Sequence, residues 1–191
     1  MTKNNVDIVV IGGSAGSIPV ICELIEVLPS PFDFAVVIVI HRSKNVISEM
    51  EQILAVKRKE IMVKEPDDKE PIQKNCVYLA PQNYHLLIEE THSFCLDYSE
   101  LVSYSRPSID VTFESIAEIY TQKAVAILLS GANGDGSHGM AEIIARGGTG
   151  IVQEPSTAEY PVMPQLALDA NTEAKAWTPA QISTYIHTLN V

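Results

Sequence analysis

A short apolar run that ends at two glycines and a serine constrains the fold of this chain more than any other stretch. Residues 8–11 are all β-branched, which is typical of a buried strand, and Gly12, Gly13 and Ser14 follow at once. Beyond them, apolar residues recur at the spacing of one helix face, at Ile18, Ile21, Cys22, Ile25 and Leu28. Ser14 is therefore predicted to lie at a strand-to-helix junction, the edge where open α/β sheets bind their ligands.

The junction leaves three interpretations open. A serine on a tight turn can act as a nucleophile, and a glycine loop can wrap around a phosphate. The dinucleotide fingerprint needs Gly-x-Gly-x-x-Gly, but counting from Gly12 the chain supplies Gly12, Ser14 and Ser17, and the Lys-Ser/Thr ending of a phosphate loop is absent. The third interpretation is a Gly/Ser-rich turn that has no function.

Further apolar runs predict the rest of a parallel sheet. Residues 34–40 and 124–129 are apolar throughout, as expected for strands buried on both faces, and residues 147–153 predict a short last strand. Residues 76–81 and 85–89 surround a short turn and predict an antiparallel pair, with residues 93–98 as a third candidate strand. The fold is thus predicted to be α/β and doubly wound, with a mainly parallel sheet flanked by helices and an antiparallel hairpin at one edge.

The helices are predicted from their caps and their apolar spacing. After Ser108, a plausible N-cap, apolar residues recur at Phe113, Ile116, Ala117 and Tyr120. Thr178 and Pro179 open a final helix. Residues 48–59 and 140–145 also favour helix, and the charged, proline-bearing residues 60–71 favour an exposed connection.

Composition limits the class of protein. A chain of 191 residues with 46% hydrophobic content is expected to form a single domain over residues 1–191. The net charge of −11, with 13 Lys and Arg, argues against nucleic acid as a partner. No apolar run is long enough for membrane insertion, and the first residues lack a signal-peptide core, so we expect a cytoplasmic protein. The three cysteines have no Cys-x-x-Cys spacing and predict neither a disulfide nor a metal site.

Three polar residues follow three of the predicted strands. Ser14 follows the first strand, His41 follows residues 34–40, and Asp135 lies in the glycine-rich loop after residues 124–129. A serine hydroxyl is too weak an acid to attack a carbonyl unaided, so an imidazole must take its proton and a carboxylate must orient the imidazole. Together the three residues indicate acyl transfer. Taken singly, His41 also fits a structural role and Asp135 a helix cap.

Arg106 is a further candidate, because it precedes the helix that Ser108 opens. Its guanidinium suits a substrate carboxylate, and it equally suits an ion pair with a surface acid.

These motifs together resemble the CheB family of chemotaxis protein-glutamate methylesterases, from about Val6 to near the C-terminus. The segments that carry the resemblance are, in chain order, residues 11–16, 39–41, 77–81, 85–86, 106–110, 129–131, 134–136, 153–155 and 163–164. Several separated motifs in the right order make the match specific. The family's triad corresponds to Ser14, His41 and Asp135.

The resemblance implies hydrolysis of glutamate γ-methyl esters on methyl-accepting chemotaxis receptors, often with deamidation of receptor glutamines, and no metal or organic cofactor. It implies that the backbone N–H of Ala132 holds the oxyanion. Ala15 beside the serine, and Ala132-Asn133 in the aspartate loop, depart from the usual family residues, which bears on substrate preference.

A typical member also begins with a phosphorylatable receiver domain. This chain starts almost directly at the first catalytic strand, so we expect no receiver domain in it. It is then either an unregulated form, a form regulated in trans, or an excised fragment.

Two alternatives to an esterase remain at this point. A CheB-like domain that is catalytically weak or inactive would bind a signalling partner without turnover, but the presence of Ser14, His41 and Asp135 favours the enzyme. A nucleotide-binding protein that uses the loop from Gly12 to Ser17 is disfavoured by the missing glycines.

Overall fold

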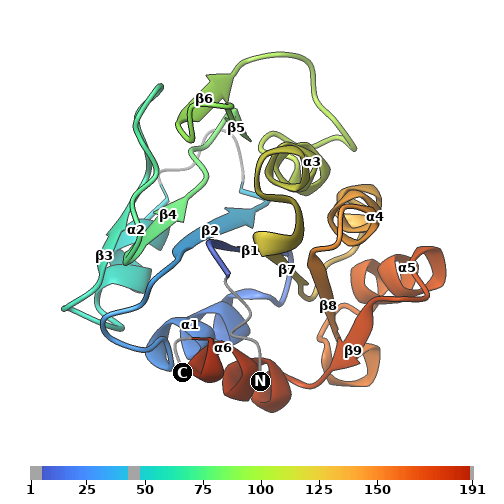
Figure 1. The fold of residues 1–191 in the computed structure, drawn as a ribbon. Helices are drawn as coiled ribbons and strands as arrows, with labels where there is room; N and C mark the ends of the chain where they lie inside the picture. The colour runs from blue at the N-terminus through green and yellow to red at the C-terminus, as the bar shows by residue number, and fades with distance from the viewer. Residues whose placement is uncertain (1–5, 43–47, 190–191) are drawn as a thin grey trace.

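The computed structural model describes residues 6–42 and 48–189 (Figure 1). In this part of the chain, seven strands form a parallel sheet in the order β3-β4-β2-β1-β7-β8-β9. Because all the pairings are parallel, the carboxyl ends of the strands meet at one edge. The strands are β1 (Ile8–Gly13), β2 (Ala35–Ile40), β3 (Met62–Lys64), β4 (Cys76–Leu79), β7 (Ala124–Leu128), β8 (Thr149–Gln153) and β9 (Lys175–Trp177).

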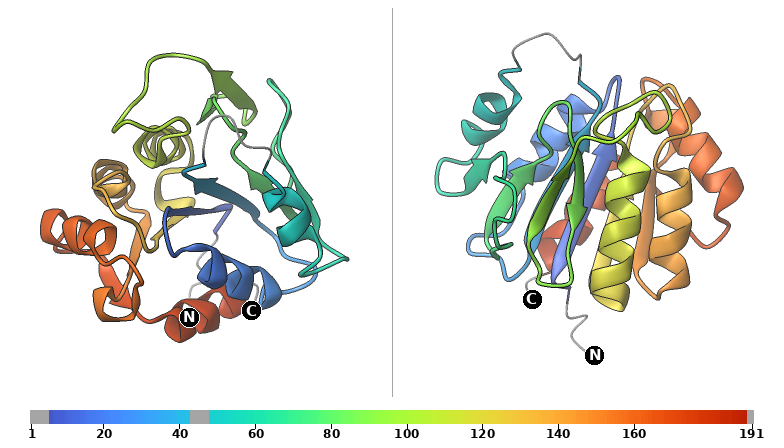
Figure 2. Two further views of the ribbon diagram at one scale, coloured as in Figure 1. Left: turned by 180° about the vertical axis from the view of Figure 1, so that it is seen from behind. Right: turned by 90° about the horizontal axis from the view of Figure 1, so that it is seen from above.

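Helices cover both faces of the sheet (Figures 1 and 2). One face packs against α1 (Ile18–Glu26), α2 (Met50–Ala55) and α6 (Pro179–Thr188), and the other against α3 (Ile109–Tyr120), α4 (Ser137–Ala145) and α5 (Val162–Ala170). Side chains alternate along β1. Val9 and Ile11 therefore pack in the core on the side of α1, and Ile8 and Val10 pack in the core on the side of α3. Two short 3-10 helices, Thr121–Lys123 and Pro155–Thr157, follow α3 and β8. The predicted doubly wound α/β fold is confirmed.

The antiparallel pair differs in its partners from the sequence prediction. We expected residues 76–81 to pair with residues 85–89. Instead β4 lies inside the parallel sheet between β2 and β3, and β5 (His85–Ile88) pairs with β6 (Phe94–Asp97) as a separate two-stranded sheet. All four residues of β4 are buried, which requires cover on both faces and favours a place within the main sheet over a place in a hairpin.

Short elements at the edges were missed. β3 and β9 have three residues each and lie at the two ends of the sheet, where little burial is needed to hold a strand. β3 lies within residues 60–71, which the sequence predicted as an exposed connection, and α2 is shorter than the predicted helix 48–59. The proline-rich stretch before residue 164 leads into α5, which the sequence did not predict.

The helices that the sequence predicts from both an N-cap residue and a regular apolar spacing, after Ser108 and after Thr178, are present as α3 and α6. Phe113, Ile116, Ala117 and Tyr120 are all buried on α3. Thr178 and Gln181 form a capping box at the start of α6, because each side chain bonds the backbone N–H of the other.

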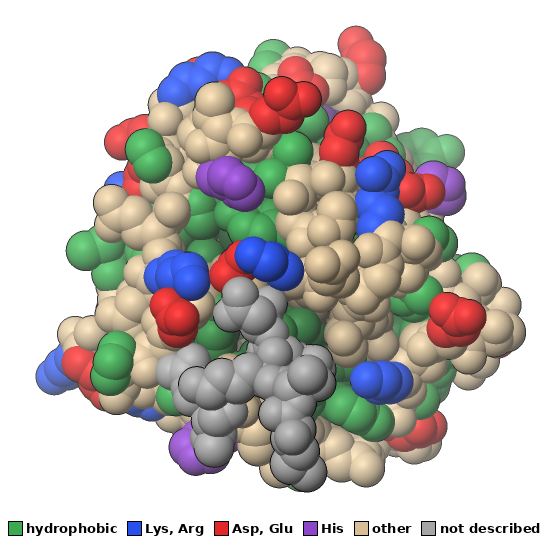
Figure 3. Space-filling view, in the orientation of Figure 1, with side chains coloured by type: hydrophobic (Ala, Val, Ile, Leu, Met, Phe, Trp, Pro, Cys, Tyr) green, Lys and Arg blue, Asp and Glu red, His purple; other side chains and the backbone are tan. Residues whose placement is uncertain are grey.

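Charged side chains of both signs are mixed on the face shown in Figure 3. Ion pairs join opposite charges in the described part of the chain, such as Lys123 with Asp7 at 2.8 Å and Arg58 with Glu60 at 2.6 Å. Within residues 6–42 and 48–189, no helix is long and apolar enough to cross a membrane.

The crossing of α3 and α4 depends on Gly139, and this yields a stability prediction. A Cβ atom at Gly139 would lie 2.5 Å from Phe113 Cβ and 2.9 Å from the Asp110 carbonyl oxygen. Alanine in a helix is ordinarily favoured over glycine by about 1 kcal/mol. Here we expect Gly139→Ala to lower the free energy of unfolding by about 1–3 kcal/mol, because the two helices must separate.

Urea unfolding followed by circular dichroism measures the change. Ser137→Ala, two residues earlier in the same first turn of α4, is the matched control. The Ser137 hydroxyl is buried without a hydrogen-bond partner among the described residues, so its loss is expected to be neutral or stabilising. An increase in stability for Gly139→Ala would contradict the close packing of the helices.

Candidate active site

Ser14 lies directly after β1, in the loop that leads into α1. Its backbone N–H donates to the Ser130 carbonyl at 2.9 Å, and its own carbonyl accepts from the Ser17 hydroxyl at 2.7 Å. Both contacts hold the main chain and leave the half-buried Ser14 hydroxyl outside the loop's own hydrogen bonds. The loop therefore presents this side chain at the carboxyl edge of the sheet, as the sequence predicts.

Ser130 ties this loop to its neighbours. Its buried hydroxyl donates to the Ala15 carbonyl at 2.8 Å and accepts from the Tyr160 backbone N–H at 2.9 Å. Gly16 fits beneath this contact with φ at +76°, and a Cβ there would lie 2.8 Å from the Ser130 hydroxyl oxygen. The main chain around Ser14 is thus fixed by packing from β7 and from the segment after β8.

His41 lies at the end of the neighbouring strand. Gly13 of β1 is in register with Ile40 of β2, and the His41 backbone N–H points to the Gly13 carbonyl at 3.4 Å. Ser14 and His41 therefore occupy equivalent positions on adjacent strands. Next to His41, Arg42 forms an ion pair with Glu65 at 2.7 Å and donates to the Ala80 carbonyl, which anchors the chain after β2.

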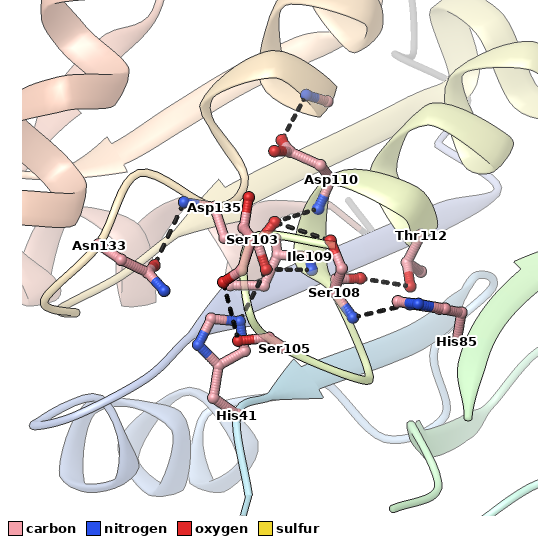
Figure 4. Close-up of polar contacts among 11 residues, drawn as sticks. His41, His85, Ser103, Ser105, Ser108, Ile109, Asp110, Thr112, Asn133 and Asp135 are labelled. Carbon is pink, nitrogen blue, oxygen red and sulfur yellow. Dashed lines mark hydrogen bonds and ion pairs between the residues drawn. The ribbon is translucent and has the colours of Figure 1, made fainter. Parts of the chain in front are cut away.

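Asp135 is fully buried and faces His41 (Figure 4). Its Oδ2 atom accepts from His41 Nε2 at 2.7 Å and from the Ile109 backbone N–H at 2.8 Å. Its Oδ1 atom accepts from the Ser108 hydroxyl at 2.8 Å and from the Asp110 backbone N–H at 3.0 Å. Four donors fill the acceptor positions of the carboxylate, which sits at the N-terminus of α3 as a cap supplied from another loop.

These contacts decide the charge of Asp135 and the tautomer of His41. Burial raises the pKa of Asp135, but the hydrogen bonds from His41 and from the start of α3 outweigh burial and hold the pKa below its usual value. The ionised carboxylate accepts only, so His41 Nε2 carries the hydrogen. In the neutral ring, Nδ1 is then the nitrogen with the free lone pair.

His85 and Ser108 support this arrangement, and the sequence did not predict their part in it. Ser108 is the N-cap residue of α3, but its side chain makes no capping bond and donates to Asp135 instead. The Ser108 backbone N–H donates to His85 Nδ1 at 3.1 Å, and His85 Nε2 lies 2.9 Å from the Glu100 carbonyl. His85 is fully buried, and in the sequence it stands out only as part of the motif at residues 85–86.

The other predicted site residues lie at the same edge of the sheet. Ala132 is exposed in the loop that carries Asp135, and Ala15 is exposed beside Ser14. The backbone N–H of Ala132 makes no hydrogen bond to any residue in the described part of the chain. This N–H is therefore available to a ligand.

Arg106 makes contacts that neither of its predicted roles anticipated. Its guanidinium donates to the Tyr98 and Ser99 carbonyls and lies over the Tyr98 ring, 3.8 Å from the centroid. An ion pair with a surface acid is not formed among residues 6–42 and 48–189, and contact with a substrate carboxylate stays a prediction.

The site contains the groups that acyl transfer needs. The imidazole is oriented by a buried carboxylate, and a serine follows the adjacent strand. Within the described residues, no hydrogen bond joins the Ser14 hydroxyl to His41, and such bonds often form only when substrate is bound. Among residues 6–42 and 48–189, no three His, Cys, Asp or Glu side chains lie close enough together to hold a metal ion.

Comparisons with known proteins agree with this chemistry. The family model described as CheB methylesterase matches residues 9–186. A protein of Leptospira interrogans named putative protein-glutamate methylesterase/protein-glutamine glutaminase is 42% identical over 168 residues, which cover 88% of this chain and 86% of that protein. A Thermotoga maritima protein-glutamate methylesterase/protein-glutamine glutaminase is 32% identical over 85% of this chain, which spans 48% of that longer protein.

The fold also matches a solved structure. The crystal structure of the Thermotoga maritima CheB methylesterase catalytic domain superposes with a TM-score of 0.90 at 29% sequence identity, over 96% of this chain and 98% of that one. The agreement extends over nearly the whole of both chains.

A second carboxylate next to the site gives a pH-dependent stability prediction. Burial, together with the nearby Asp135 charge, raises the pKa of Asp110 to about 6, and the Gly139 N–H at 2.7 Å only partly opposes the shift. The folded protein therefore binds a proton that the unfolded chain has lost, and Asp110 costs stability as the pH rises from about 4 to about 6.

We expect Asp110→Asn to stabilise the protein more at pH 7.5 than at pH 4.5, by about 1 kcal/mol once the partial exposure of the group is allowed for. Urea unfolding of both proteins at the two pH values measures the difference. An equal effect at both values would show that Asp110 titrates normally.

Proposed function

The chain belongs to the CheB methylesterase family, and on this premise we propose that it is a serine esterase that hydrolyses glutamate γ-methyl esters on methylated chemoreceptors or chemoreceptor-like proteins. One observation carries the proposal. The 2.7 Å hydrogen bond between His41 Nε2 and a fully buried Asp135 orients an imidazole at the strand end next to Ser14.

The first step is attack by Ser14 on the ester carbonyl. His41 Nδ1, which has the free lone pair, takes the hydroxyl proton as the Ser14 Oγ–carbon bond forms. Asp135 keeps the ring in this tautomer and stabilises the positive charge that the ring acquires. The tetrahedral intermediate then expels methanol, which receives its proton from His41, and leaves an acyl-enzyme on Ser14.

The oxyanion of the intermediate is held by backbone donors. The backbone N–H of the exposed residue Ala132, which makes no hydrogen bond among the described residues, is the proposed donor, and Ala15 follows Ser14 in the same site. A donor of this kind lowers the barrier by about 3 kcal/mol. Water, activated by His41, then attacks the acyl group, releases the glutamate side chain and restores the Ser14 hydroxyl.

The same acyl-enzyme is reached from a glutamine side chain if ammonia leaves in place of methanol. The relatives whose names include protein-glutamine glutaminase support this second activity. The reaction needs His41 to protonate a poorer leaving group. Regulation by a receiver domain in trans stays a prediction.

The opposing candidate is an interaction domain without turnover. A domain that only binds has no need for a carboxylate that is fully buried and saturated by four donors behind a histidine. Catalysis explains that arrangement, and the two candidates differ in whether methanol is released.

We expect Ser14→Ala to lower methanol release from a methylated receptor fragment by at least about 10³-fold, because the remaining groups contribute only binding and oxyanion stabilisation. A fluorophosphonate probe is expected to label the wild-type protein and not this variant.

Ser137→Ala is the matched control, since it removes a hydroxyl two residues after Asp135 without touching the proposed nucleophile. Labelling or methanol release that persists in Ser14→Ala, or that is lost in Ser137→Ala, would reject Ser14 as the nucleophile.

A further inference from the structure

Large apolar side chains are exposed beside the candidate active site, on a loop that the mechanism does not use. The loop covers residues 98–106, here named the Tyr98 loop, and connects β6 to α3. Tyr104 is 96% exposed and Tyr98 67% exposed, and Leu101 and Val102 are exposed with them. Apolar exposure gathered on one loop is typical of a surface that contacts another protein.

The loop is anchored to the catalytic network. His85, which holds the Ser108 backbone, also bonds the Glu100 carbonyl, and Arg106 holds the carbonyls of Tyr98 and Ser99. Ser105 lies three residues before Ser108, whose hydroxyl donates to Asp135 at 2.8 Å. Figure 2 shows the loop at the same end of the molecule as the tip of β1.

Two neighbouring side chains contact Tyr98. The Arg106 guanidinium lies 3.8 Å from the centroid of the Tyr98 ring, and the Tyr84 ring is tilted against it at 58°, with 5.7 Å between centroids. Because these contacts hold the Tyr98 side chain before any partner binds, little of its conformational entropy is lost on contact.

The tip of the loop has an unusual residue. Val102 and Ser105 exchange backbone hydrogen bonds of 3.2 and 2.9 Å around a two-residue turn in which Ser103 and Tyr104 have φ of 50° and 61°. Such turns normally contain Asn and Gly, because side chains are strained at positive φ. A bulky tyrosine in this conformation, with almost no contact to its own protein, indicates a role outside the fold.

The charges near the loop do not favour an ionic partner. Within residues 98–106, Glu100 and Arg106 are the charged residues, and the Arg106 guanidinium is already engaged by main chain and by Tyr98. The chain as a whole has a net charge of −11. Contact at this loop therefore depends on apolar surface.

We propose that the Tyr98 loop docks the apolar segment of the substrate protein that flanks the modified glutamate. This inference rests on the proposed function, in which the ester is carried by a protein. A glutamate side chain is short, so that the main chain bearing it must pass over the surface next to Ser14 and His41. The Tyr98 loop leads into Ser108 and so borders that surface.

Tyr104→Gly tests the proposal, because glycine relieves the strained φ and the variant is expected to fold at least as well as wild type. The comparison is between methanol release from a methylated receptor fragment and hydrolysis of p-nitrophenyl acetate, which is too small to reach the loop. We expect the ratio of the two kcat/KM values to fall about tenfold, mainly through KM for the fragment. Val56→Ser, which changes an exposed apolar residue at the end of α2, should leave the ratio unchanged.

Binding measured without turnover separates this inference from the proposed function. In a Ser14→Ala background, Tyr104→Gly should weaken binding of the fragment about tenfold in isothermal titration. Unchanged affinity would overturn the proposal that the loop docks the substrate protein. That result is also expected if the loop instead contacts a receiver domain or a second copy of the chain. A different result would separate the two proposals. If the wild type releases no methanol but its binding of the fragment still depends on Tyr104, the esterase function is overturned and the docking role of the loop is retained.

Discussion

The buried carboxylate of Asp135 is the interaction on which the site depends. A buried charge is tolerated only when its oxygens are satisfied, and here four donors, one from the end of β2 and three from the start of α3, do this. Two of the donors are the first backbone N–H groups of α3, so the carboxylate caps a helix and orients His41 at once. Loss of this one charge would leave the helix N-terminus, the Ser108 hydroxyl and the imidazole without their common partner.

The parallel sheet brings these groups together. Ser14, His41 and the loop with Asp135 follow β1, β2 and β7, which are neighbours in the sheet, and the register of Gly13 with Ile40 sets the first two side by side. Ser130 then joins the β1 and β7 loops through its hydroxyl. The fold thus supplies rigid strand ends, and the loops between them supply the chemistry.

Local patterns of apolar residues and glycines predicted the strands and their ends better than the contacts between segments that are distant in the chain. β-branched runs that end at Ser14 and His41, and a glycine loop after a third run, were enough to place these residues at one edge of a parallel sheet. Ser108 was expected to cap its own helix, and its turn toward Asp135 follows from a contact between loops 27 residues apart. The strand at residues 76–79 was assigned to a hairpin, because a short turn follows it and nothing local reveals its parallel neighbours.

The tautomer of His41 is the most direct test of this account, because it follows from the buried charge of Asp135 alone. Nitrogen-15 NMR of histidine-labelled protein, at a pH where the His41 ring is neutral, reports which ring nitrogen carries the hydrogen. We expect Nε2 to be protonated and Nδ1 to be free, and this preference to be lost in Asp135→Ala. A wild-type ring with the hydrogen on Nδ1 would contradict the account, since the lone pair would then face Asp135 and leave none for the Ser14 hydroxyl.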